Sequence, residues 1–233
     1  MSDNDMESKK HWERVYTTKP VTGVSWYQEH SERSLRLIEA TRVPKSGSII
    51  DVGGGTSTLV DDLLDAGYRD VSVLDLSRAA LLAAQSRLGP KSALVHWLEA
   101  DITKAELPTR AYDIWHDRAV FHFLTSEADC RLYVAQVLRA VKPGGHVIVA
   151  TFAEDGPTRC SGLPVVRYSP TELHGQFGSS FVLLKQEREE HRTPYNDRPI
   201  GAPSGTRTRR ATYQRSSAEP QVMPPPTASS MTR

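Results

Sequence analysis

The sequence of 233 residues has only two cysteines and no long apolar segment. Cys130 and Cys160 lie far apart, without the spacing of a zinc site, so we expect no metal. No apolar run approaches the roughly 20 residues that a membrane-spanning helix needs. The first residues are acidic and polar, unlike a secretory signal. These absences predict a soluble, cytoplasmic protein that has no membrane partner.

An excess of charge is also lacking. The chain has 29 basic and 28 acidic residues, for a net charge of +1. Nothing in the overall balance therefore indicates a nucleic-acid partner. Neither a Ser-His-Asp set nor a P-loop is visible. The length suits one domain with a sizeable core and some additional chain.

What the sequence does contain is a strand that continues through glycines into a helix. A β-branched run leads into residues 51–56, Asp-Val-Gly-Gly-Gly-Thr, and apolar residues at helical spacing follow up to residue 66. Glycine has no Cβ, so the backbone can approach a ligand closely. The start of the helix presents unpaired N–H groups to that ligand. The pattern predicts a nucleotide-binding turn, with a glycine turn that binds nothing as the alternative.

The acid before the glycines narrows the choice of ligand. A dinucleotide fingerprint requires a third small residue where this chain has Thr58. The carboxylate of Asp51 would repel a pyrophosphate, but it suits a ligand with an amino group and a sulfonium. The pattern resembles motif I of the class I S-adenosylmethionine (SAM)-dependent methyltransferases. The resemblance extends over residues 11–194 and implies SAM as the cofactor.

The expected fold class is α/β, with a doubly wound, mostly parallel sheet and helices on both faces, as in Rossmann-like methyltransferases. Buried strands are expected at residues 48–52, 71–75, 93–98, 111–117, 146–152 and 181–186. The fold normally has a seventh, antiparallel strand. We find no pattern for it after residue 194, and we expect it to be missing or altered.

Both ends of the chain are predicted to lie outside the domain at residues 11–194. Residues 1–10 are expected to be flexible. Residues 195–233 are rich in Pro, Ser, Thr and Arg and are predicted to form a disordered basic tail. One interpretation is weak contact with RNA or acidic partners. The other is a nonfunctional extension from an altered reading frame that replaces the last strand.

The resemblance implies contacts with the methionine part of SAM. Asp51 and the glycines Gly53, Gly54 and Gly55 would hold this part of the cofactor. Asp117 ends the fourth predicted strand and would lie near the methionine amino group.

Acids at the ends of two other strands complete the predicted cofactor site. Asp75, followed by Leu76, lies about twenty residues beyond the glycine turn, where a carboxylate can accept hydrogen bonds from a ribose diol. The alternative is that Asp75 only caps the next helix. Asp101 and Ile102 follow the third strand, where the resemblance implies contact with adenine. Leu76 would pack on the adenine ring.

Residues for the methyl acceptor are harder to assign. His122 is the candidate general base, with His116 second, although a lone histidine often has a structural role. An aromatic amino-terminal segment with Trp12 and Tyr16 resembles a lid, and the alternative is packing. The candidate substrate-binding residues are Trp26, Tyr27, Phe121, Phe152, Arg167 and Tyr168.

The expected function is methyl transfer from SAM to a small molecule by in-line displacement. A protein lysine is the alternative acceptor, because the aromatic amino-terminal pattern resembles elongation-factor lysine methyltransferases. Residues 117–120 lack the Asn/Asp-Pro-Pro-Tyr pattern of enzymes that methylate bases. An NAD(P)-dependent oxidoreductase is a candidate from another class, although no Tyr-x-x-x-Lys pair is present. A non-catalytic SAM-binding protein is a further possibility.

Overall fold

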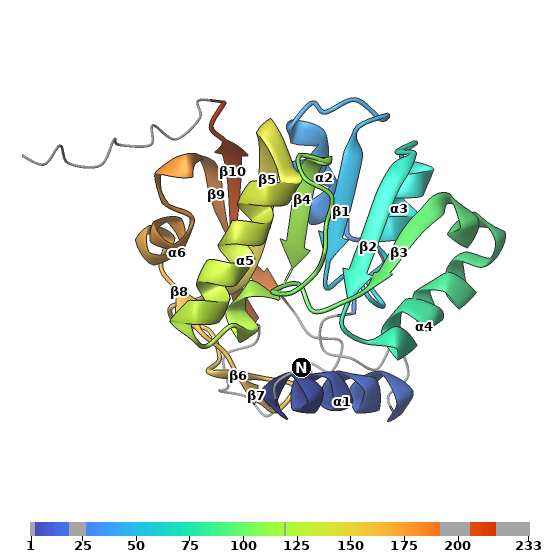
Figure 1. The fold of residues 1–233 in the computed structure, drawn as a ribbon, viewed down its shortest axis with the longest axis horizontal. Helices are drawn as coiled ribbons and strands as arrows, with labels where there is room; N and C mark the ends of the chain where they lie inside the picture. Colours follow the sequence, from blue (N-terminus) through green and yellow to red (C-terminus); the bar gives the residue numbers. More distant parts are fainter. Residues whose placement is uncertain (1–2, 19–26, 119, 192–205, 218–233) are drawn as a thin grey trace, which may run out of the picture.

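The structure is a computed structural model and describes residues 3–18, 27–118, 120–191 and 206–217. One mixed sheet organises the fold, with strand order β3-β2-β1-β4-β5-β10-β9 (Figure 1). The short strand β8 pairs with β5 beside this path. Helices of the described chain cover both faces, so the structure has the doubly wound α/β architecture that the sequence predicts.

The parallel core of the fold consists of five strands, three helices that connect strands (α3, α4 and α5) and helix α2, which precedes the first strand. The strands are β1 (Ser48–Val52), β2 (Asp70–Asp75), β3 (Val95–Glu99), β4 (Tyr112–Arg118) and β5 (Val141–Ala153). The helices are α2 (Glu32–Ala40), α3 (Leu59–Asp65), α4 (Arg78–Leu88) and α5 (Glu127–Ala140). The parallel pairs bring the carboxyl ends of the strands to the same edge.

The rest of the chain flanks this parallel core. It comprises α1 (Asp3–Thr18), β6 (Arg159–Cys160), β7 (Leu163–Pro164), β8 (Arg167–Tyr168), α6 (Pro170–Phe177), β9 (Phe181–His191) and β10 (Thr206–Arg215). Short 3₁₀ turns occur at Gly89–Leu94, Phe121–Phe123 and Gly178–Ser180. Helix α1 lies across the carboxyl ends of the parallel strands (Figure 1).

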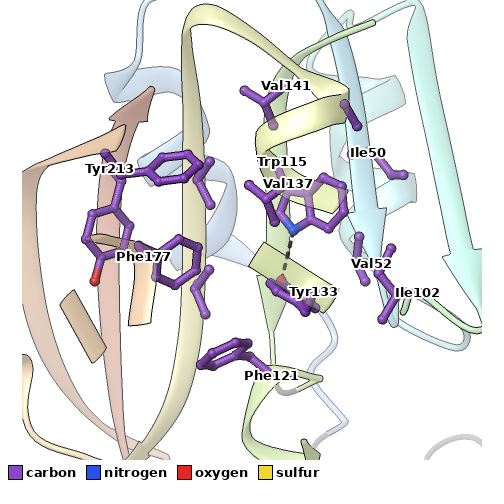
Figure 2. Close-up of a cluster of buried hydrophobic side chains, with 14 of the residues drawn as sticks. Ile50, Val52, Ile102, Trp115, Phe121, Tyr133, Val137, Val141, Phe177 and Tyr213 are labelled. Carbon is purple, nitrogen blue, oxygen red and sulfur yellow. Dashed lines mark hydrogen bonds between the residues drawn. The ribbon is translucent and has the colours of Figure 1, made fainter. Parts of the chain in front are cut away.

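Two hydrophobic clusters, one on each face, hold the sheet and its helices together. On the α5 and α6 face, Tyr133 and Phe177 pack with the fully buried Trp115 (Figure 2). Trp115 satisfies its indole N–H by donating to the Tyr133 hydroxyl at 2.9 Å. The other cluster joins α2, α3 and α4 to the opposite face through residues such as Leu63. Apolar residues therefore alternate between the faces of β1, where Ile49 and Ile50 belong to different clusters.

The prediction that the seventh strand is missing is wrong. Strand β10 lies antiparallel between β5 and β9, at residues that the sequence assigns to a disordered tail. The composition misleads because β10 buries arginines: Arg209 is 8% exposed and Arg210 is 3% exposed. Each makes an ion pair, Arg209 with Glu154 at 2.9 Å and Arg210 with Glu189 at 2.7 Å. Paired buried charges here take the place of apolar residues.

The two predicted ends of the domain also need correction. Residues 206–215 belong to the sheet, so the domain extends beyond residue 194. Residues 3–10 are not loose but begin helix α1, which Lys9 ties to the sheet through an ion pair of 2.5 Å with Glu99. None of the helices in the described ranges is long and apolar enough to cross a bilayer.

Candidate active site

The glycine turn after β1 has a backbone that other residues would not accept. Gly53 has a φ of +69°, and a Cβ built on it would lie 2.1 Å from the Val120 side chain. A Cβ on Gly55 would lie 2.5 Å from Oδ2 of Asp75. With no side chain, the Gly55 N–H donates to that oxygen at 3.0 Å. The turn therefore brings the backbone against the end of β2.

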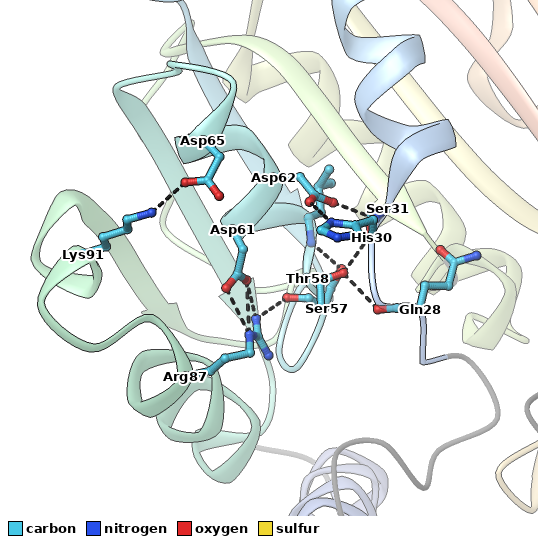
Figure 3. Close-up of polar contacts among 11 residues, drawn as sticks. Gln28, His30, Ser31, Ser57, Thr58, Asp61, Asp62, Asp65, Arg87 and Lys91 are labelled. Atoms are coloured by element: carbon cyan, nitrogen blue, oxygen red, sulfur yellow. Dashed lines mark hydrogen bonds and ion pairs between the residues drawn. The ribbon is translucent and has the colours of Figure 1, made fainter.

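Contacts around the start of α3 hold this turn in place (Figure 3). Arg87 donates to the carbonyl oxygens of Thr56 at 3.0 Å and Ser57 at 2.6 Å. It also forms an ion pair of 2.7 Å with Asp61. The Thr58 hydroxyl donates to the Gln28 carbonyl oxygen at 3.1 Å. The turn is thus fixed from both sides before any ligand binds.

A cavity of about 370 Å³ opens beside the turn, at the carboxyl ends of the parallel strands. Its wall contains three carboxylates from successive strand ends, Asp51, Asp75 and Asp101. Trp12 and Tyr16 also line it, and they belong to α1, the helix that lies across these strand ends in Figure 1. Further wall residues that the sequence singles out are Gly53, Leu76, Ile102, His122 and Phe152.

Asp51 contributes a carboxylate to the cavity wall, and one of its oxygens has no partner in the part of the chain that the structure describes. Its carboxylate is buried, and Oδ1 forms a hydrogen bond of 2.7 Å with Nδ1 of His116. Oδ2 has no hydrogen-bond partner among the described residues. Leaving a buried carboxylate oxygen unpaired is costly, so this position suits a ligand that brings a donor, such as an ammonium group.

Asp75 lies at the end of β2 and accepts two backbone hydrogen bonds. The donors are Gly55, to Oδ2, and Ser77, to Oδ1 at 2.8 Å. The Ser77 hydroxyl caps α4 by accepting from the Ala80 N–H at 3.2 Å. Each carboxylate oxygen of Asp75 keeps a lone pair for a ligand. Burial raises the pKa of Asp75 to about 7.

Asp101 and Ile102 lie one strand further along the same edge. Oδ1 of Asp101 accepts from the backbone N–H of Thr103 at 2.9 Å and from its hydroxyl at 2.8 Å. Ile102 and Leu76 add apolar surface to this end of the cavity. The three carboxylates are thus hydrogen-bond acceptors in different surroundings. Asp51 has an oxygen without a partner among the described residues, Asp75 has lone pairs left for a diol, and Asp101 lies beside apolar side chains. These residues fit SAM.

Asp117 is not part of the cavity wall. It is fully buried, and its carboxylate accepts from the backbone N–H groups of Val120 at 2.7 Å and Phe121 at 3.0 Å. The Tyr133 hydroxyl donates a third bond of 2.6 Å. Burial raises the pKa of Asp117 to about 7. Asp117 therefore holds the loop after β4 in place through these hydrogen bonds. It does not line the cavity, where the sequence predicts it beside the methionine amino group.

Three predicted substrate residues lie away from the cavity. Phe121 and Tyr168 are core residues whose rings lie 5.5 Å apart, and Arg167 is exposed. The half-buried Tyr27 is not in the cavity wall either. Trp26 lies outside the described residues. The sequence predicts Phe121, Arg167 and Tyr168 from loops that follow strands, and such a position does not tell whether a side chain faces the cavity. Trp26 and Tyr27 are predicted from a segment that resembles a lid.

His122 lies in the cavity wall with its ring stacked on Phe152, at 4.6 Å between centroids. Neither ring nitrogen has a hydrogen-bond partner in the described part of the chain. Burial lowers the pKa of His122 to about 3. The imidazole is therefore neutral at pH 7, with one acceptor and one donor nitrogen, and both nitrogens are buried.

Sequence reasoning missed several polar residues in the cavity wall. They are Gln28, Arg118, Thr151, Glu189, Thr208 and Arg210. The position of Arg118 at the end of β4 is a signal that could have identified it. No sequence signal identified Arg210, because β10 itself was not predicted. Arg118 donates to the side-chain oxygen of Gln28. Burial, and then the neighbouring Arg210, lower the pKa of Arg118 to about 10.

Comparison with known proteins finds similarity to methyltransferases. Residues 49–145 match the family model described as a methyltransferase domain. A mouse (Mus musculus) eEF1A lysine and N-terminal methyltransferase is 25% identical over 159 residues, which are 66% of this chain and 22% of the relative. The chain thus spans about a fifth of the length of that relative. Human EEF1A lysine methyltransferase 2 is 22% identical over 193 residues, 77% of this chain and 76% of the relative.

Solved structures show the same fold. One solved structure comes from work on the conversion of a disulfide bond into a thioacetal group during echinomycin biosynthesis. It has a TM-score of 0.73 and 17% identity to this chain, and the match covers 92% of this chain and 95% of the other. Burkholderia thailandensis 1,6-didemethyltoxoflavin-N1-methyltransferase, with bound S-adenosylhomocysteine (SAH), has a TM-score of 0.62 and 20% identity, covering 91% and 86%. The family match favours the methyltransferase over the oxidoreductase interpretation. The findings thus support a methyltransferase domain at residues 49–145, in a chain with the class I SAM-dependent methyltransferase fold.

Proposed function

We propose that the chain transfers a methyl group from SAM to a small-molecule acceptor. The observation that carries this proposal is the border that Asp51, Asp75 and Asp101 form along one cavity. SAM, when bound, supplies an electrophilic methyl group on a sulfonium. Asp51 would accept from the amino group, Asp75 from the ribose hydroxyls and Asp101 from the adenine amine.

The protein contributes to the transfer by holding the nucleophile in position and by keeping water away from the reacting groups. Holding a nucleophile in line at about 3–3.5 Å can remove several kcal/mol from the barrier. Trp12 and Tyr16 cover the cavity, and Phe152 and His122 form an apolar wall that excludes water. Charge disperses as a methyl group leaves a sulfonium, so a dry site favours the transition state.

His122 orients the nucleophile and does not act as a strong base. Its neutral ring accepts a hydrogen bond from the nucleophile and so directs a lone pair of the nucleophile along the transfer axis. With a pKa of about 3, it takes up a proton reluctantly near pH 7. An acceptor whose nucleophile is already neutral or anionic suits this arrangement best.

The charges at the acceptor end support a small molecule that carries no positive charge. Arg118 and Arg210 both line the cavity. Arg210 is ion-paired with Glu189, and Arg118 donates to the side-chain oxygen of Gln28. The guanidinium groups are cationic hydrogen-bond donors, which suit the lone pairs of an anionic or neutral acceptor.

Protein lysine methylation is a second candidate, favoured by the names of two relatives, the eEF1A lysine and N-terminal methyltransferase and EEF1A lysine methyltransferase 2. A lysine would have to reach the cavity as an ammonium and lose a proton there. The arginines and the low pKa of His122 oppose both steps. We therefore place a small molecule first.

Two measurements test the proposal. SAH at about a hundredfold excess over its Kd should raise the melting temperature by roughly 5 °C or more, and NAD should leave it unchanged. Incubation with methyl-labelled SAM and a cell extract should then label material that passes a small-pore filter. Label retained with protein would favour lysine, and the absence of any labelled product would indicate a non-catalytic SAM-binding protein.

A further inference from the structure

A buried chain of hydrogen bonds joins the last strand of the sheet to Asp51. Arg210 on β10 donates from Nη1 to the Ser34 hydroxyl on α2 at 3.0 Å. The same hydroxyl lies 3.0 Å from Nε2 of His116 on β4. Nδ1 of His116 lies 2.7 Å from Oδ1 of Asp51 on β1. All four residues are at most 3% exposed, so water does not substitute for these contacts.

The chemistry of the groups limits the direction of these hydrogen bonds. A guanidinium only donates, so the Ser34 oxygen accepts from Arg210. That oxygen keeps a second lone pair and one hydrogen, so Ser34 can donate to a lone pair on Nε2 of His116 or accept from an Nε2–H. If Ser34 donates, the hydrogen that bonds His116 to Asp51 lies on Nδ1 of the ring.

We propose that Ser34 donates to His116 and that Arg210, Ser34 and His116 are positioning residues, which hold the carboxylate of Asp51 in one rotation. His116 occupies Oδ1, and Oδ2 has no hydrogen-bond partner among the described residues. The group that Asp51 would hold is the amino group of SAM, so the inference rests on the proposed function.

This chain of hydrogen bonds from Arg210 to Asp51, here called the relay, also explains why β10 carries a buried arginine. Arg210 is held from its other side by Glu189 on β9, at 2.7 Å from Nε. The end strands of the sheet are in this way connected to the carboxylate of the glycine turn, although neither strand pairs with β1. An apolar residue at position 210 could fill the same space but could not set the proton on His116.

Ser34→Ala is the sharpest test, because Ser34 does not line the cavity and alanine suits a helix. In the wild type, ¹⁵N NMR of the ligand-free protein should show His116 protonated on Nδ1 alone. In Ser34→Ala the two neutral tautomers should mix. The Kd for SAH, measured by calorimetry, should rise about five- to tenfold, because Asp51 loses its fixed orientation.

Ser72→Ala is the matched control. It removes another buried serine hydroxyl, which bonds to Tyr112 on a neighbouring part of the sheet away from the cavity. It should change neither the His116 spectrum nor the Kd. His116→Phe is a second variant and should weaken SAH binding at least as much as Ser34→Ala.

The possible results separate the two proposals. Wild-type protein with His116 protonated on Nε2, or on both nitrogens, would overturn the relay whatever the variants do. An unchanged Kd in folded Ser34→Ala would also overturn it. Wild-type protein that binds no SAH would instead contradict the proposed function, while the NMR spectrum would still decide the direction of the hydrogen bonds.

Discussion

Asp75 is the residue whose ionisation should control binding. Its pKa of about 7 lies well above the ordinary value because burial disfavours the charge, whereas two ribose hydroxyls favour it. Binding should therefore release a proton near neutral pH. We expect the affinity for SAH to fall by up to about tenfold per pH unit below pH 7.

Calorimetry in buffers of different ionisation enthalpy measures this proton release. Because the folded pKa is raised, ionisation of Asp75 destabilises the unliganded protein as pH increases through 7. The thermal shift caused by SAH should consequently be larger at about pH 8 than at about pH 6. Asp75→Asn should bind about ten- to a hundredfold more weakly and lose this pH dependence. A pH dependence that survives in Asp75→Asn would refute the assignment.

For His122 we expect a modest effect that does not depend on pH. With a pKa of about 3, the imidazole stays neutral from about pH 5 upward. His122→Ala should reduce kcat/KM by about tenfold through loss of orientation and leave the shape of the pH profile unchanged. A loss of about a hundred- to ten-thousandfold, together with loss of a break near neutral pH, would instead identify a general base.

The sequence predicts the strand-end aspartates of the cavity better than it predicts the other residues of the cavity wall. Asp51, Asp75 and Asp101 can be located because an acid that ends a parallel strand must lie at the shared edge of the sheet. Whether a side chain near that edge points into the cavity depends on local packing. Phe121 and Tyr168 accordingly lie in the core, while His122, next in the chain to Phe121, faces the cavity.

Among the elements, α1 is the one that closes the cavity, and Glu13 attaches it. The Glu13 carboxylate accepts from the backbone N–H groups of Arg78 at 2.6 Å and Ala79 at 3.2 Å, at the start of α4. A negative charge at a helix amino terminus is favourable in itself. Glu13 therefore joins the lid to the helix that follows Asp75.

Glu13→Gln should weaken this attachment. We expect a decrease in melting temperature of about 2–4 °C, corresponding to a loss of about 1 kcal/mol, and a several-fold faster release of SAH. Stopped-flow fluorescence of Trp12 can follow the release. Glu39→Gln, which removes an exposed ion pair with Lys45 of 3.0 Å, is the control and should change neither quantity. Equal effects of the two variants would contradict the lid role of α1.

Strand β10 shows where element prediction from composition fails. Its neighbours, β5 and β9, have recognisable apolar runs, but β10 combines the buried Ala211 and Tyr213 with two buried arginines, Arg209 and Arg210. The acids that neutralise these arginines lie on other elements, so a linear sequence does not reveal the pairing. The order of the parallel strands, in contrast, follows from hydrophobic runs separated by helices.

For the whole molecule, β10 should decide whether the domain is stable. Without it, β5 and β9 would each expose an unpaired edge, and Tyr213, fully buried, would leave the core. A chain ending at His191 should be insoluble or lack a cooperative transition. A chain ending at Ser217, which keeps β10, should melt within about 2 °C of the full protein and bind SAH. A soluble, cooperatively folded chain that lacks β10 would contradict this role.

Titration of the full protein with SAH in a calorimeter tests the central claim most directly. The border of Asp51, Asp75 and Asp101 should give saturable binding with a stoichiometry near one, and replacing Asp51 or Asp75 by Asn should weaken it about tenfold or more. Binding that is absent from the folded wild-type protein, or that is unchanged in both variants, would show that these strand-end acids do not form the cofactor site.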